Sequence, residues 1–81
     1  MNKTESAVEY LKGVISPLCV DQEQLVIEFT INELGLNLLV SASTKDLPFL
    51  IGKYGMTANA IRQVLLIWGA RHGAKVNFSI P

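Results

Sequence analysis

The sequence predicts a single α+β domain in which helices cover one face of a three-stranded sheet, in the order α-β-β-α-α-β. Three observations support this prediction. Three segments alternate apolar and polar residues, two segments repeat apolar residues at helical spacing, and proline and glycine separate them. The length of 81 residues is enough for one domain, so we expect residues 1–81 to form one unit.

A helix is predicted for the N-terminal segment, over residues 4–16. Thr4 or Ser6 can cap its first turn, and Pro17 should end it near Ser16 because proline has no amide hydrogen to donate. Its apolar residues recur at the three-to-four spacing of a helix with one buried side. They are Val8, Leu11, Val14 or Ile15, and Leu18.

Two strands are predicted next, over residues 25–32 and 36–43, because both segments alternate with a period of two. The turn at residues 33–35 is too short for a parallel crossover, so the two strands should form an antiparallel hairpin. Residues 74–80 alternate in the same way and predict a third strand. The residues expected on the buried faces are Leu25, Ile27, Phe29 and Ile31, then Leu36, Leu38, Val40 and Ala42, then Ala74, Val76, Phe78 and Ile80.

Two further helices are predicted between the second and third strands. Residues 44–48 combine capping side chains with an early proline, which is typical of a helix start, and Gly52 keeps this helix short. A longer helix is expected from about Thr57 to Ala70, with Gly73 beyond its end. Its apolar stripe consists of Ile61, Val64, Leu65 and Trp68.

The chain has no residue arrangement typical of an enzyme or a metal site. Cys19 is the only cysteine, and we expect it to pack as a small apolar side chain. His72 stands alone after the last helix, where a surface or helix-end role is expected. Asp46 is better explained as a helix-start residue than as a general base. We therefore expect no catalytic residue, no bound metal and no cofactor.

The charge balance limits how the protein could bind nucleic acid, and the N-terminus indicates where in the cell it is expected. Seven Lys and Arg residues balance seven Asp and Glu residues, which argues against tight, charge-driven binding of nucleic acid but leaves room for a local site. The N-terminus lacks an apolar signal core, and no apolar run is long enough to span a bilayer. A cytoplasmic protein that does not enter a membrane is expected.

A glycine-containing turn, Gly-Lys-Tyr-Gly at residues 52–55, joins the two predicted helices. Two glycines three apart let the chain reverse sharply and leave the backbone open to a sugar–phosphate chain. The amides that open the second helix would then point at phosphate oxygens, and Lys53 adds a charge for the same target. A plain helix–helix turn would have the same glycines, and only the surrounding helices and strand favour nucleic acid.

The stretch around this turn resembles the type II KH domain of the small bacterial single-KH-domain RNA-binding proteins. Residues 50–62 contain Ile-Gly-Lys-x-Gly followed by Thr57, Ile61 and Arg62, and the length and element order are similar over essentially the whole chain. The resemblance implies a protein that grips single-stranded RNA with little sequence specificity. It also implies a post-transcriptional or ribosome-associated regulator that pairs as a homodimer or with a larger KH-containing protein.

The resemblance further implies which residues bind RNA. The loop at residues 52–55 would hold the backbone of about four nucleotides, and Ile51 would form the floor of the groove. Part of residues 36–43 would form the opposite wall, and Arg62 would reach a phosphate or a base edge. The expected RNA-binding residues are Ile51, Gly52, Lys53, Tyr54, Gly55, Thr57 and Arg62.

Three positions depart from the basic pattern common in such proteins: Phe49, Tyr54 and Met56 stand where basic residues often occur. RNA binding should therefore be weaker than in relatives that have basic residues at these positions, although Phe49 and Tyr54 can stack on bases. The alternative function is a protein-interaction or dimerisation module with a weakened RNA groove. Acidic side chains around the turn would favour this alternative. Convergence of the basic residues on the face of the turn would favour RNA, namely Lys3, Lys12, Lys45, Lys53, Arg62 and Lys75.

Apolar residues on the outer side of the longer helix predict an interface. Met56 and Ile67 fall on an edge that the predicted core does not need, and Leu66 lies among polar residues. Burying one such side chain is worth roughly 1.5–3 kcal/mol, so a partner is expected to cover them. The alternative is that the first helix of the same chain covers this edge through Val8, Leu11 and Ile15.

Overall fold

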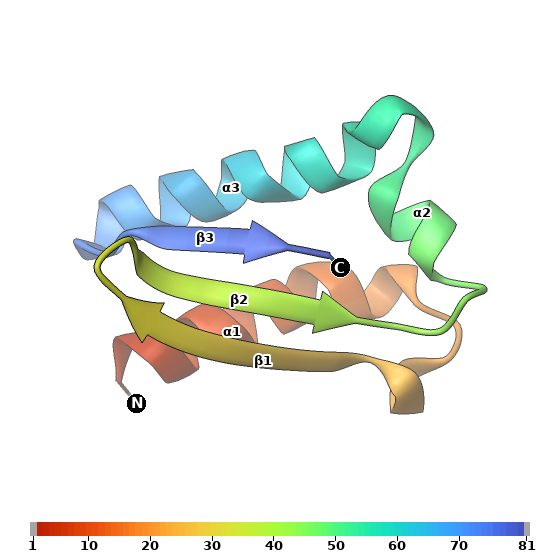
Figure 1. The fold of residues 1–81 in the computed structure, drawn as a ribbon, viewed down its shortest axis with the longest axis horizontal. Helices are drawn as coiled ribbons and strands as arrows, with labels where there is room; N and C mark the ends of the chain where they lie inside the picture. Colours follow the sequence, from red (N-terminus) through yellow and green to blue (C-terminus); the bar gives the residue numbers. More distant parts are fainter. Residues whose placement is uncertain (1, 81) are drawn as a thin grey trace.

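The computed structural model describes residues 2–80 and shows helices packed on one face of a three-stranded sheet (Figure 1). The predicted element order is confirmed, with short 3-10 turns after the first helix and before the last. The elements are α1 (Lys3–Ile15), η1 (Ser16–Leu18), η2 (Gln22–Gln24), β1 (Val26–Asn32), β2 (Gly35–Ser41), α2 (Leu47–Ile51), η3 (Lys53–Gly55), α3 (Met56–His72) and β3 (Val76–Ser79).

The sheet has the order β1-β2-β3, with β2 in the centre. β1 pairs with β2 antiparallel, placing Phe29 opposite Leu38, and the predicted hairpin is thereby confirmed. Asn32 accepts a hydrogen bond from the Leu34 amide at 2.8 Å, which fixes the turn between the two strands. β3 pairs with β2 in parallel, because α2 and α3 carry the chain back to the starting end of β2 before β3 begins.

The core lies between the sheet and the helices α1 and α3. Trp68 closes one side of it by stacking on Tyr10 of α1, with ring centroids 6.0 Å apart, and on His72, at 4.2 Å. The predicted packing role of Trp68 is therefore correct, and Cys19 is buried as predicted. The buried apolar residues are Ala7, Leu11, Ile15, Cys19, Leu36, Leu38, Val40, Leu50, Ile61, Leu65, Val76 and Phe78.

The start of α1 differs from the prediction. Asn2, rather than Thr4 or Ser6, caps the helix, because its side-chain oxygen accepts a hydrogen bond from the Glu5 amide at 2.8 Å. Asparagine is among the strongest capping residues, so the helix begins at Lys3.

The predicted burial of β1 is wrong over half of its length. Phe29 is 51% exposed and Ile31 is 67% exposed, although they lie on the face of the sheet that packs against the helices. Their cross-strand neighbours on β2, Leu38 and Leu36, are buried. The cover provided by the helices therefore ends between β2 and β1.

Asp46 is only 2% exposed and joins two loops. Its carboxylate accepts hydrogen bonds from the amides of Val20 and Asp21, both at 3.0 Å, and from the Ser43 hydroxyl at 3.2 Å. The residue precedes α2 as predicted, but its side chain caps no amide of that helix. The Val20 hydrogen bond is the main cause that lowers the pKa of the Asp46 carboxyl; burial opposes it, and Asp21, Ser43 and Lys45 add to the lowering.

Replacing Asp46 with asparagine (Asp46→Asn) should destabilise the fold at neutral pH, because a neutral amide accepts weaker hydrogen bonds from the two backbone amides. The folded-state pKa of this carboxyl lies below its unfolded value. Its stabilising contribution is therefore present above the unfolded pKa and is lost as the pH falls through the folded pKa. Urea unfolding from about pH 7 to about pH 2 should show a stability difference between wild type and variant that narrows in acid.

Asp21→Asn is the matched control, since Asp21 contacts Asp46 through its backbone amide. This control should keep the wild-type stability at neutral pH. A difference between wild type and Asp46→Asn that stays constant across the pH range would contradict the assigned role of the carboxylate.

Candidate nucleic-acid interface

The loop at residues 52–55 makes a tight connection between α2 and α3. Gly52 has φ 78° and ψ 170°, and Gly55 has φ 74° and ψ 16°, so both glycines use backbone conformations that other residues rarely adopt. Tyr54 also has a positive φ, of 57°, and is the only such residue that is not glycine among residues 2–80. Three of the four residues of the loop therefore have a positive φ.

The two glycines have different structural roles. A Cβ atom on Gly52 would lie 2.7 Å from the amide nitrogen of Thr57 and would also clash with the Thr57 hydroxyl. A Cβ atom on Gly55 would meet nothing closer than the Asn59 side chain, at 4.0 Å. Gly52 is thus required for close packing inside the loop, whereas Gly55 leaves open space at the start of α3.

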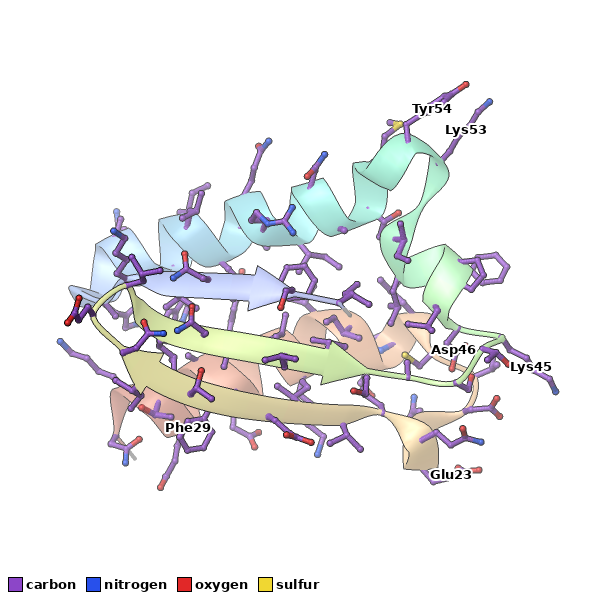
Figure 2. All side chains as sticks on the ribbon, in the orientation of Figure 1. Glu23, Phe29, Lys45, Asp46, Lys53 and Tyr54 are labelled. Atoms are coloured by element: carbon purple, nitrogen blue, oxygen red, sulfur yellow. The ribbon has the colours of Figure 1, made fainter. Side chains whose placement is uncertain are left out.

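Lys53 and Tyr54 project together from the tip of the loop, away from the rest of the molecule (Figure 2). Tyr54 is 88% exposed, and the Lys53 ammonium lies 5.5 Å from the centre of its ring. A cation and an aromatic face are therefore presented side by side to solvent. These are the two groups that bind a phosphate and stack on a base.

The N-terminus of α3 opens directly from the loop. The Met56 amide donates to the Lys53 carbonyl within η3. No side chain caps this end of the helix, so the amides that follow Met56 have no capping side chain and can donate to an anion. Thr57, a predicted site residue, is half-buried beneath Gly52. Its position fits a role in shaping the loop.

The other predicted site residues lie on either side of the loop. Ile51 is partly exposed at the end of α2. Arg62 lies along α3, where it donates to Asn59 at 2.8 Å and to the Phe78 carbonyl at 3.4 Å, with its guanidinium 5.5 Å from the Phe78 ring. Arg62 is thus tied to β3 and lies further from the loop than the other site residues.

The strand that lies along α3 is β3, not β2 (Figure 1). The expectation that part of residues 36–43 forms the wall opposite the loop helices stays a prediction. The sequence could not reveal that β3 lies next to α3, because strand order depends on the parallel pairing of β3 with β2.

Acidic and basic residues are segregated along the chain, a feature that the zero net charge conceals. Six of the seven acidic residues lie between residues 5 and 33, where Lys12 is the only basic residue. Residues 47–81 contain no Asp or Glu, but contain Lys53, Arg62, Arg71 and Lys75. The acidic segments α1 and β1 lie on the side of the molecule away from the loop (Figure 1).

The basic residues do not all converge on the loop. Lys3, for example, approaches the Gly73 carbonyl at 3.5 Å, beyond the far end of α3. The loop nevertheless has no acidic residue in its own segment, which favours RNA over the alternative. The absence of acidic residues around the loop can be seen in the order of charges along the sequence, but not in the net charge.

Among residues 2–80, no three His, Cys, Asp or Glu side chains lie close enough to hold a metal ion. Within the same residues, no helix is long and apolar enough to cross a membrane.

This architecture defines the class of protein: an α-β-β-α-α-β domain with a GxxG loop between its second and third helices is a type II KH domain. The chain belongs to the KhpA/KhpB KH-domain family, whose model matches residues 8–80. The resemblance seen in the sequence is thereby confirmed, and membership supports an RNA-binding role. No curated protein and no solved structure matches the chain.

Gly52→Ala should destabilise the fold more than Gly55→Ala. An alanine at Gly55 adds the strain of a positive φ, about 1–2 kcal/mol. An alanine at Gly52 adds that strain and also displaces Thr57. Urea unfolding of both variants measures the difference, and equal losses of stability would contradict the distinction between the two glycines.

Proposed function

We propose that this protein binds single-stranded RNA through the loop at residues 52–55, with little sequence specificity, as a cytoplasmic post-transcriptional or ribosome-associated regulator. The observation that carries the proposal is the exposed loop itself. Lys53 and Tyr54 project from its tip, next to an uncapped helix N-terminus, in a segment without acidic residues.

The chemistry of the loop supports a division of roles. The α3 amides and Lys53 would bind phosphate oxygens, and the open space at Gly55 would let the RNA backbone approach. Ile51 would contact a base from below and Tyr54 would stack on another. All of these contacts are to phosphates or to base faces, which is why little sequence specificity is expected.

Arg62 would have a smaller part in binding RNA. Its guanidinium already donates to Asn59 and Phe78, so contact with RNA would require it to give up or share these bonds. We therefore propose that Arg62 mainly holds α3 against β3.

A second proposal concerns pairing, either as a homodimer or with a larger KH-containing protein. Met56 and Ile67 are 66% and 63% exposed, so α1 of the same chain does not cover the outer edge of α3. Val64 and Leu66 add further exposed apolar surface to this helix. A partner that covers the edge would bury these side chains.

Replacing Lys53 and Tyr54 together with aspartate should abolish RNA binding and leave the fold intact. Both side chains are exposed, and negative charge at the tip repels phosphate. Fluorescence anisotropy with a labelled mixed-sequence single-stranded RNA measures the loss, and circular dichroism checks the fold.

The matched control is Lys12→Asp with Gln24→Asp, which makes the same change in net charge at exposed positions of the acidic half. It should retain most of the affinity. RNA binding by the loop is ruled out if the folded Lys53–Tyr54 variant binds as tightly as this control.

Ile67→Lys should reduce self-association, because it places a charge in the middle of the exposed edge of α3. Light scattering at concentrations up to about 100 µM measures the oligomeric state. Leu34→Lys is the control, since Leu34 is similarly exposed but lies in the hairpin turn. A wild-type protein that stays monomeric over this range would refute the homodimer.

A further inference from the structure

An apolar groove lies between α1 and β1, on the acidic side of the molecule. It has a volume of about 590 Å³, and Ile27, Phe29 and Ile31 of β1 form its floor with Val8 of α1. Glu5 and Glu9 of α1 also line it. Figure 2 shows Phe29 on the side of the molecule opposite Lys53 and Tyr54, so the groove is separate from the RNA loop.

No other part of the described chain fills this groove. Phe29 and Ile31 remain more than half exposed, while their cross-strand neighbours Leu38 and Leu36 are buried by the helices. The apolar inner face of the sheet therefore continues onto β1 without a cover.

β1 is also an open edge of the sheet. In an antiparallel pair, alternate residues point their N–H and C=O groups away from the partner strand, and β1 has β2 on one side only. Natural edge strands are commonly protected by proline, lysine, a bulge or short length. β1 has seven residues, contains neither proline nor lysine, and pairs one-to-one with β2 from Val26 to Asn32 without a bulge. Its only charged residue is Glu28.

The charges around the groove indicate which kind of molecule can bind there. Glu5 and Glu9 line the groove, and Glu28 lies on the opposite face of the same strand. RNA is disfavoured because these carboxylates repel phosphate. A second copy of this chain is disfavoured as well, since antiparallel pairing of two β1 strands would bring both sets of carboxylates together. A basic partner is complementary.

We propose that β1 and the groove beside it bind an extended segment of a partner protein, which adds to the sheet as a fourth strand next to β1. Alternate residues of this segment are apolar and pack on Phe29 and Ile31. The residues between them are lysine or arginine and lie beside Glu28, while flanking basic residues reach Glu5 and Glu9.

A synthetic nine-residue peptide of alternating lysine and valine, with blocked ends, tests this proposal on the intact chain. NMR titration of the isotope-labelled protein should give saturable amide shifts in β1 and α1 and none at residues 52–55. A peptide with glutamate in place of lysine should bind at least about tenfold more weakly. A peptide with proline at alternate positions should not bind, because proline cannot donate to the new ladder.

Two variants locate the site. Phe29→Ser removes an exposed side chain from the floor, and Glu5→Lys with Glu9→Lys reverses the charge of the lining. Each should weaken binding of the lysine–valine peptide about tenfold or more, and Phe29→Ser, which leaves the net charge unchanged, should not change RNA affinity. The second variant keeps the test decisive if the first fails to fold.

The proposal is overturned by any of three results. The lysine–valine peptide gives no saturable shifts in β1, or the lysine and glutamate peptides bind equally well. The third result is a dimer that Phe29→Ser dissociates and Ile67→Lys does not. A second copy of the chain would then be the molecule that binds in the groove.

Discussion

The carboxylate of Asp46 accepts hydrogen bonds from two backbone amides and a hydroxyl in the interior of the protein, and the position of the loop at residues 52–55 depends on this contact. Val20 and Asp21 belong to the loop that leaves α1, and Asp46 begins α2. The contact therefore fixes α2 relative to α1. Because α2 has only five residues and leads directly into Gly52, any movement of its first turn would be passed on to the loop.

Separation of charge lets a neutral chain have two surfaces of opposite character. The C-terminal half carries the loop and has basic residues with no acid beyond Asp46, while residues 5–33 carry six of the seven carboxylates. Those carboxylates disfavour tight binding of RNA to any other face, so the segregation would also orient the molecule on RNA bound at the proposed loop. The same charges leave the open edge of β1 suited to a basic protein segment and unsuited to a second copy. RNA and a protein partner could thus bind the same chain at once.

Much of the fold and the loop could be predicted from the sequence, because both rest on local signals. Alternation located the strands, and residues 52–55 were recognised from two glycines and their flanking helices. The exposure of Phe29 could not be predicted, because alternation shows which side chains share a face and not whether a helix reaches that face. The role of Asp46 was missed because its partners lie 25 and 26 residues away and are backbone amides, which leave no mark in the sequence.

The conformation of Tyr54 connects the shape of the loop with its use. A residue other than glycine at a positive φ is strained by about 1–2 kcal/mol, and nothing in the core requires a tyrosine at this exposed position. Glycine would relieve the strain but would remove the aromatic face beside Lys53. A loop already held in its final shape loses little conformational entropy when a ligand binds. In the proposed RNA-binding role, such preorganisation would offset the small number of positive charges at the tip, because the few contacts proposed for Lys53, Tyr54 and the α3 amides would need little rearrangement of the loop.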